Sequence, residues 1–357
     1  MKRIGMLTSG GDCQGLNAAL RGVAKTLYQH YGSDVQIFGI RDGYRGLIEG
    51  DYHPMAPADF SGILVQGGTI LGTSRQPFKK MQVEENGVDK VARMKETYNK
   101  MKLDCLVILG GNGTHKTANL LSQEGLHVVT LPKTIDNDLW GTDMTFGFQS
   151  AVDIATNVLD CIHTTATSHG RVFIVEVMGH KVGWLTLHAG IAGGADVILL
   201  PEIPYDVDKI AKVLSRRNEM GKRFSILAVA EGALSKEEAK LSKKEFKAAR
   251  AKMTEPSISY RLAGELASRT GQEIRVTIPG HFQRGGSPCA FDKMLSTRFG
   301  AAAGKLIIKE QYGYMVGLRD NKVVPVPLCE VAGKLKTVPV DCQEVKTARL
   351  LGISLGD

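Results

Sequence analysis

LPKTIDNDLWG, residues 131–141, sets Asp136, Asn137 and Asp138 side by side directly after an apolar run. That run, residues 127–131, predicts a buried strand that ends at Pro132. Carboxylates crowded into a cleft repel one another and lose hydration, so such a group is stable when it holds a metal ion or takes up a proton. Asp and Asn also form ordinary turns. The stretch alone therefore leaves a catalytic or metal site and an Asx-rich turn as alternatives.

The composition predicts two globular domains that bind small anions. The chain has 357 residues, of which 43% are hydrophobic and 41 are glycine, enough for a large core and unusually long for one domain. The formal net charge is +8, but aromatic residues make up only 6%. A nucleic-acid surface needs a basic stripe with stacking aromatics. We therefore expect small phosphorylated ligands and no nucleic acid.

The cysteines and the amino-terminal residues favour a cytoplasmic protein. The six cysteines lie far apart and form no C-x-x-C pair, so free thiols are expected. MKRIGML, residues 1–7, is too short an apolar run for a signal sequence, and no run approaches the roughly 18 residues of a membrane span. We expect a cytoplasmic chain that makes no membrane contact.

Strand, glycine-rich loop and helix follow one another twice in the first half. Their ranges are 2–7, 8–15 and 16–29 in the first copy and 104–109, 110–114 and 115–123 in the second. Such loops suit phosphate, because unpaired amides and the positive end of the helix point at them. Neither loop has the G-x-G-x-x-G or Walker spacing. Between them, GGTILGTSR at 67–75 adds Arg75, whose guanidinium suits phosphate oxygens.

The second half continues the alternation of strands and helices. Strands are predicted at 171–177, 196–200, 224–230 and 273–278. Helices are predicted at 150–163, at 235–252 and at 290–309, and a further helix follows the loop 178–183 and ends at 187. Gly179 with His180, Glu202 and Glu231 follow three of these strands, and ligands bind at that edge of an open α/β sheet. The charged segment 235–252 predicts an exposed helix without chemistry.

Five motifs, in this order, resemble those of the phosphofructokinase family. They are TSGGD at 8–12, GGNGT at 110–114, PKTIDND at 132–138, VEVMG at 175–179 and GHFQRGGSP at 280–288. The resemblance covers the chain from Lys2 to about Gly304, with the lysine-rich segment 235–252 as an insertion. It implies an α/β phosphofructokinase fold of two similar three-layer α/β/α domains with mostly parallel sheets and an active site in the interdomain cleft.

The resemblance also implies the domain roles and the reaction. The donor domain would comprise 1–140 with about 285–333, and the sugar-phosphate domain 141–284 with the C-terminal tail. The reaction would be that of an ATP-dependent kinase of glycolysis. It would transfer a phosphoryl group, with Mg²⁺, to the 1-hydroxyl of fructose 6-phosphate and give fructose 1,6-bisphosphate.

The resemblance assigns catalytic roles to four residues. Asp136 matches the general base, because the sugar hydroxyl must lose a proton to attack. Thr134 would orient the sugar and the transferring group, and Arg75 would neutralise charge on that group. Gly113 would line the donor pocket.

The resemblance also implies sets of binding residues. Residues implied to bind the substrate, with Thr134 and Asp136, are Ile135, Arg171, Met178, Gly179, His180, Glu231, Arg275, His281, Phe282, Gln283 and Arg284. Residues implied to bind ATP are Gly11, Arg75, Gln76, Gly111, Asn112, Gly113, Thr114 and Lys133, and Asn112 and Asp138 would bind the metal.

Arg171 and Arg275 match residues that reach the 6-phosphate from a neighbouring subunit. The resemblance therefore implies a homodimer or homotetramer with shared active sites. His281 matches a third 6-phosphate ligand, and Glu231 and Arg284 match residues that contact the sugar hydroxyls. Taken alone, His281 fits a core histidine and Arg275 a sheet-edge ion pair. Their expected placement at the carboxyl ends of strands favours binding.

The donor pocket combines features of two groups within the family. Gly113 matches ATP users, whereas pyrophosphate users typically have an aspartate there that would repel an α-phosphate. Lys133 matches pyrophosphate users, but a lysine beside polyphosphate suits either donor. We therefore favour ATP. The alternatives are a pyrophosphate-dependent fructose-6-phosphate phosphotransferase and a non-catalytic sugar-phosphate-binding regulatory protein.

Two substitutions favour the regulatory alternative. Asn112 stands where the family usually has an aspartate for magnesium, and an amide is a weaker ligand than a carboxylate. His180 replaces a usual arginine, which would reduce or relocate the stabilisation of charge in the transition state. Asp136, Thr134 and Arg75 are all present, which favours catalysis.

Overall fold

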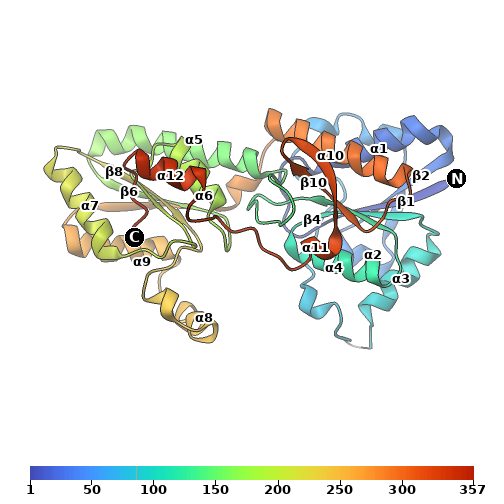
Figure 1. The fold of residues 1–357 in the computed structure, drawn as a ribbon, viewed down its shortest axis with the longest axis horizontal. Helices are drawn as coiled ribbons and strands as arrows, with labels where there is room; N and C mark the ends of the chain where they lie inside the picture. The colour runs from blue at the N-terminus through green and yellow to red at the C-terminus, as the bar shows by residue number, and fades with distance from the viewer. Residues whose placement is uncertain (86) are drawn as a thin grey trace. The chain divides into compact units, whose positions relative to one another are not determined.

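The chain folds into two α/β units, each built around its own sheet (Figure 1). The structure, a computed structural model, describes residues 1–85 and 87–357. The first unit comprises residues 1–150 and 284–336, and the second comprises 151–283 and 337–357. The chain first passes from the first unit to the second after residue 150, and not after 140 as expected. Asp143 still belongs to the first unit, where its backbone N donates to Leu318 O at 2.7 Å.

The first unit contains a seven-stranded sheet of order β11-β10-β5-β4-β1-β2-β3. Its strands are β1 (Lys2–Ser9), β2 (Val35–Ile40), β3 (Tyr52–Met55), β4 (Cys105–Gly110), β5 (Val128–Pro132), β10 (Tyr314–Arg319) and β11 (Lys322–Pro327). Only the β2–β3 and β10–β11 pairs are antiparallel. The strand order reverses between β1 and β4, so the loops after these two strands border the crevice where open sheets bind ligands.

Helices cover both faces of this sheet (Figure 1). On one face lie α1 (Leu16–Tyr31) and α10 (Ala290–Ile308), and on the other α2 (Tyr44–Glu49), α3 (Lys90–Lys100), α4 (Asn112–Gln123) and α11 (Leu328–Val331). The second face shares a buried core with the central strands, including Met94, Leu121 and Ile108. Helices α1 and α10 approach closely, since a Cβ on Gly300 would lie 2.4 Å from the Ala19 carbonyl oxygen.

The second unit contains a four-stranded parallel sheet of order β7-β8-β6-β9. Its strands are β6 (Val172–Val177), β7 (Val197–Leu199), β8 (Ser225–Ala230) and β9 (Ile274–Thr277). Its helices are α5 (Phe148–His169), α6 (Trp184–Ala192), α7 (Val207–Glu219), α8 (Lys243–Ala251), α9 (Ile258–Thr270) and α12 (Gln343–Leu350). One buried core joins α7 and α9 to the sheet and another joins α6 and α12 to it. The unit therefore has three layers.

The lysine-rich segment corrects one prediction. The single helix expected over 235–252 is two pieces, a 3-10 turn at Glu238–Lys240 and then α8. Ser242 begins α8, because its hydroxyl accepts from Glu245 N while the Glu245 carboxylate accepts from Ser242 N in a capping box. Helix α8 buries no side chain and extends away from the sheet of its unit (Figure 1).

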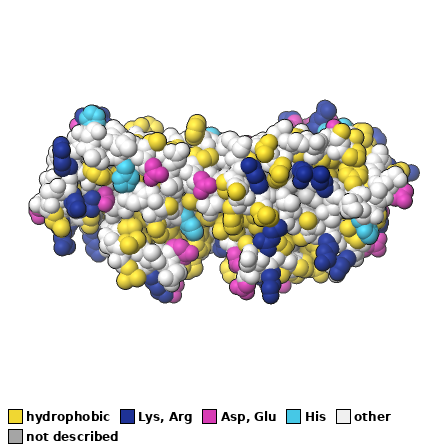
Figure 2. Space-filling model, turned by 90° about the horizontal axis from the view of Figure 1, so that it is seen from above, with side chains coloured by type: hydrophobic (Ala, Val, Ile, Leu, Met, Phe, Trp, Pro, Cys, Tyr) yellow, Lys and Arg dark blue, Asp and Glu magenta, His cyan; other side chains and the backbone are white. Residues whose placement is uncertain are grey.

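Surface charge, cysteine state and helix hydrophobicity can each be compared with the predictions. On the face in Figure 2, Lys and Arg side chains of each unit lie among apolar and acidic groups, without a continuous stripe. All six cysteines, which lie within the described residues, are free thiols, as expected. Across residues 1–85 and 87–357, no helix combines the length and apolar character needed to cross a membrane.

Candidate active site

The loop after β1 is held against the segment that contains Arg75. Gly10 N donates to Ser74 O at 3.0 Å, and Thr73 Oγ1 donates back to Gly10 O at 2.7 Å. Gly10 has a left-handed φ of 88°, which glycine adopts without strain. Arg75, which is exposed, and Gln76 directly follow this bonded segment, as Gly11 directly follows Gly10. The structure thus joins three of the residues predicted to bind the donor.

The loop after β4 forms the first turn of a helix. Gly111 is the N-cap of α4, and Asn112, Gly113 and Thr114 follow it. Amides of a first turn have no partner within the helix and carry the positive end of its dipole. A Cβ built on Gly113 meets no atom within 4 Å, so the space beside this turn is open.

Lys133 lies between the two glycine loops. Its side chain is buried, its ammonium hydrogen bonds to Gly11 O, and it would lie 3.7 Å from a Cβ on Gly10. Burial lowers the pKa of this ammonium below its ordinary value. Thr114 donates to Ser9 O at 3.4 Å beside it. The predicted donor residues Gly11, Thr114 and Lys133 therefore surround one point at the sheet edge.

Arg284 differs from its expected position in the sugar-phosphate domain. It belongs to the first unit, and a Cβ on Gly11 would lie 2.2 Å from its Nη1 atom. The chain enters the first unit at this residue, where Gln14 Nε2 donates to Gly285 O at 2.7 Å. The Arg284 guanidinium therefore packs directly on Gly11 in the donor loop.

The acidic stretch is a turn with two half-buried carboxylates. Asp136 N donates to Thr134 Oγ1 at 3.0 Å, and Thr145 Oγ1 donates to Thr134 O at 2.7 Å. Asn137 is buried and left-handed, with a φ of 53°, and its Oδ1 accepts from Thr145 N at 3.0 Å. Asn tolerates this conformation. Asn137 thus shapes the turn, while the flanking Asp136 and Asp138 side chains are half-buried at the end of β5.

The described residues offer few ligands for a metal ion. Within residues 1–85 and 87–357, no cluster of three or more His, Cys, Asp or Glu side chains is placed to hold one. Mg²⁺ is usually bound through one or two carboxylates and the phosphates of its substrate, so a single carboxylate such as Asp138 fits it. Asn112 donates from Nδ2 to Lys334 O at 2.7 Å, a bond that an aspartate could not make.

A second group of predicted residues meets at the carboxyl edge of the second sheet. Glu231 follows β8, and its Oε1 accepts from Gly179 N at 3.2 Å and from His180 N at 2.7 Å. Met178 N donates to Gln283 Oε1 at 3.3 Å. Loops after β6, β8 and β9 therefore converge there. His281 and Phe282 are exposed in the turn that contains the buried Gln283.

Arg171 and Arg275 lie at the opposite edge of this sheet, which corrects the expected placement of Arg275 at a carboxyl end. Arg171 precedes β6, and Arg275 pairs with Phe173 at the amino end of that strand. Both bond to Glu273, with Arg171 Nε at 2.6 Å from its carboxylate. A sheet-edge ion pair is thus present. At about 3.3 Å per strand residue, Arg171 lies roughly 20 Å from the Met178 loop.

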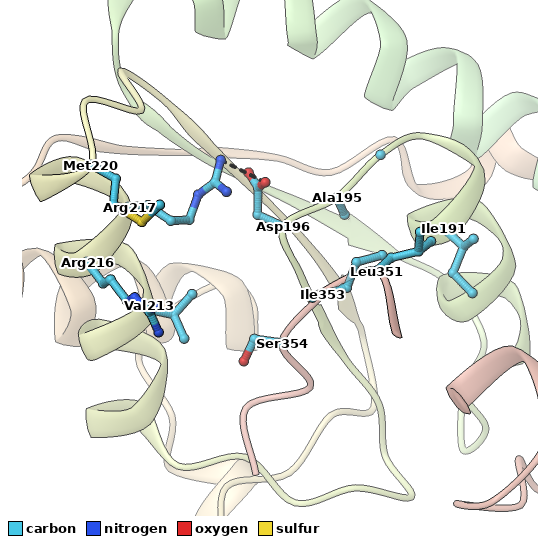
Figure 3. A pocket seen from close by; sticks show the side chains of 12 residues that line it. Ile191, Ala195, Asp196, Val213, Arg216, Arg217, Met220, Leu351, Ile353 and Ser354 are labelled. Carbon is cyan, nitrogen blue, oxygen red and sulfur yellow. Dashed lines mark ion pairs between the residues drawn. The ribbon is translucent and has the colours of Figure 1, made fainter. Parts of the chain in front are cut away.

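A cavity of about 460 Å³ in the second unit lies among α7, the end of α6 and residues 351–354 (Figure 3). Arg217 points at Asp196 across it, with 2.8 Å between guanidinium and carboxylate. Arg217 also donates to Ser225 Oγ at 2.9 Å. No predicted site residue lines this cavity.

Sequence reasoning missed one residue at the acidic turn, Lys336. Its ammonium donates to Asn137 Oδ1 at 2.9 Å. Burial lowers the pKa of Lys336 to about 8, while the charges of Asp143 and Asp138 oppose this shift. The chain after Gly313 has no periodic pattern, so no local signal pointed to it.

The edge of the first sheet carries the two glycine loops, the buried Lys133 and the carboxylates of Asp136 and Asp138. This set of groups is typical of an α/β protein that binds phosphorylated ligands. A family model described as Phosphofructokinase matches residues 3–307, and the chain belongs to the phosphofructokinase family. It is 58% identical to an ATP-dependent 6-phosphofructokinase of Spirochaeta thermophila, over 100% of this chain and 98% of that protein.

Solved structures share the fold. Phosphofructokinase of Pichia pastoris in the T-state has a TM-score of 0.80 and 34% identity, over 92% of this chain and 35% of that longer chain. A pyrophosphate-dependent phosphofructokinase of Nitrosospira multiformis has a TM-score of 0.81 and 21% identity, over 99% of this chain and 92% of that one. The predicted α/β fold class and family are thus confirmed.

Proposed function

We propose that this chain is an ATP-dependent 6-phosphofructokinase of glycolysis. It would transfer the γ-phosphoryl group of ATP to the 1-hydroxyl of fructose 6-phosphate and release fructose 1,6-bisphosphate and ADP. The observation that carries the proposal is the placement of Asp136 at the end of β5, beside the two glycine loops after β1 and β4. The name of the relative that is 58% identical supports ATP as the donor.

The first unit supplies the groups for ATP. The amides at the start of α4 and the ammonium of Lys133 would contact phosphate oxygens, and Arg75 would neutralise charge on the transferring group. The open space at Gly113 leaves room for the donor. Asp138 and Asn112 would hold Mg²⁺, which when bound with ATP neutralises charge on its phosphates.

Asp136 would act as the general base. The 1-hydroxyl oxygen bonds to the γ-phosphorus while its proton passes to the Asp136 carboxylate. The bond from the γ-phosphorus to the bridging oxygen breaks, and its electron pair leaves with ADP. Thr134 would orient the reacting groups, since its hydroxyl is fixed by the Asp136 amide.

The second unit would bind the sugar phosphate. Glu231, the backbone of Met178 and Gly179, and His281 would contact fructose 6-phosphate at the carboxyl edge of the sheet. Arg171 and Arg275 would serve the site of a neighbouring subunit in a homodimer or homotetramer. The enzyme would work in the cytoplasm on small-molecule substrates.

A second candidate is a pyrophosphate-dependent phosphotransferase. The buried Lys133 between the two glycine loops favours it, because a lysine there would bind a short polyphosphate directly. The open space at Gly113 favours ATP, since a larger donor needs that room. A non-catalytic regulatory protein is the third reading, favoured by Asn112 and His180.

The test compares initial rates of fructose 1,6-bisphosphate formation with ATP and with pyrophosphate, at matched concentrations and with Mg²⁺. We expect activity with ATP. Asp136→Asn should lower kcat by about 10²–10⁴-fold, the range of general-base catalysis, with little change in KM for the sugar phosphate. Asp160→Asn, an exposed residue of α5, is the control. Activity with pyrophosphate alone would favour the second candidate, and inactivity with both donors the third.

A further inference from the structure

A short segment after α11, residues 334–336, contacts the first turn of α4 and the acidic turn after β5. Asn112 Nδ2 donates to Lys334 O at 2.7 Å, so the segment touches the first turn of α4. Leu335 forms an isolated bridge with Leu139, and Lys336 N donates to Asp138 O at 2.9 Å. The segment lies beyond residue 307, where the family model ends.

The Lys336 ammonium lies inside the acidic turn. It donates to Asn137 Oδ1, Thr142 O and Asp143 O, each at 2.9 Å. An ammonium has three donors and no acceptor, so it can serve several oxygens of the turn at once. A side chain without donors at position 336 would leave these oxygens without that partner, which is costly for buried polar groups.

The contact with Asn137 links this ammonium to both carboxylates. Asn137 Oδ1 accepts from Lys336 Nζ and from Thr145 N, and these bonds hold the left-handed backbone between Asp136 and Asp138. If the backbone at Asn137 changes conformation, the adjacent Asp136 and Asp138 side chains must move with it. Misplacement of a catalytic group by about 1 Å can cost 10²-fold in rate.

We propose that Lys336 is a positioning residue for phosphoryl transfer, which holds Asp136 and Asp138 through the Asn137 turn. The inference rests on the proposed function, because the proposed reaction is what gives Asp136 and Asp138 their roles. In this role Lys336 acts through its hydrogen bonds to the turn.

The test replaces Lys336 by methionine, which keeps the length of the side chain and removes its donors. We expect kcat to fall about 10²-fold and KM for fructose 6-phosphate to stay within about threefold, because most of the groups proposed to bind the sugar phosphate lie on the second unit. Lys334→Met is the matched control, since Lys334 is exposed and contributes only its carbonyl to the contacts described here. Calorimetric titration with fructose 6-phosphate gives the fraction of competent sites in each variant.

The outcomes separate this inference from the proposed function. Inactive wild-type protein would contradict the proposed function. Active wild type together with Lys336→Met at the rate of Lys334→Met would overturn the role of Lys336. A loss of kcat matched by an equal loss of binding sites in both Lys336→Met and Lys336→Gln would also overturn it, because misfolding would then explain the effect. If the methionine variant does not fold, Lys336→Gln, which keeps two donors, should show a smaller fall in kcat at full binding stoichiometry, and unchanged kcat would overturn the proposal.

Discussion

At the residue scale, Gly113 shows how a missing side chain can select a ligand. It lies in the first turn of α4, and its backbone is not left-handed. The local fold therefore does not require glycine there. Space around a hypothetical Cβ is open, which leaves the ligand as the reason for the small residue.

We predict that Gly113→Asp lowers kcat/KM for ATP by more than about tenfold, since a carboxylate beside the phosphates costs over 1.4 kcal/mol. The fold should tolerate it, because an acidic residue in a first helical turn is stabilising by about 0.3–1 kcal/mol. Initial rates over an ATP series give the result.

Gly113→Ala is the control for that change. Its methyl group adds size without charge, so the alanine variant should keep more of the rate with ATP than the aspartate variant and gain about 0.5–1 kcal/mol of helix stability. An aspartate variant that uses ATP as well as the alanine variant does would remove Gly113 from the donor pocket.

At the element scale, a buried ion-pair network fastens α8 to its unit. Arg250 Nη2 in α8 donates to Glu238 Oε2 at 3.0 Å, and Arg261 Nη1 in α9 donates to Glu238 Oε1 at 2.9 Å. Glu238 is buried, whereas α8 buries no side chain of its own. A nine-residue helix is marginal by itself, so we attribute its attachment to this carboxylate.

We predict that Glu238→Gln lowers the free energy of unfolding by about 3 kcal/mol at neutral pH, since two guanidinium groups lose their counter-charge. Denaturant titration measures the loss, and Glu237→Gln, at the exposed neighbour, should change little. Equal stability of the two variants would contradict the role of the network.

The loss should also depend on pH. Burial alone raises the pKa of Glu238, but hydrogen bonds from Arg261 and Ser235 and the charge of Arg250 outweigh it and lower the pKa below 4.5. The stabilisation is therefore fully present above pH 4.5 and is lost as pH falls through the lower folded-state pKa. The difference between wild type and Glu238→Gln should shrink in that acidic range.

At the scale of the whole molecule, the two edges of the second sheet carry different parts of the predicted sugar-phosphate site. Glu231 and the Met178 loop lie at the carboxyl edge, and Arg171 and Arg275 lie at the amino edge. Roughly 20 Å of strand separates them. This separation supports the proposal that the two arginines serve a neighbouring copy.

We predict that two inactive variants restore activity when they are coexpressed. Asp136→Asn and Arg171→Ala subunits should each be impaired alone, yet a mixed pair has one site with both intact residues if Arg171 acts on its neighbour. In a symmetric interface with random pairing, about a quarter of sites would be intact. Rates of purified mixed oligomers measure it, and no gain over the separate variants would place Arg171 and Asp136 in the same subunit's site.

Much of the fold follows from local pattern. The strand, glycine loop and helix of each predicted copy are present as β1 with α1 and β4 with α4, because apolar runs and glycine clusters act over a few residues. The hairpin of β10 and β11 went unpredicted, although Asp320 and Asn321 at its turn are left-handed, as a two-residue hairpin requires.

The sequence by itself determined the family, the α/β class, the two glycine loops and the acidic turn, since each depends on residues adjacent in the chain. Tertiary structure alone decided that Arg275 lies at the amino edge, that Arg284 packs on Gly11 and that Lys336 enters the turn at Asn137. These contacts join residues up to about 270 positions apart, and such pairings follow from how sheets and helices pack, which no local pattern encodes.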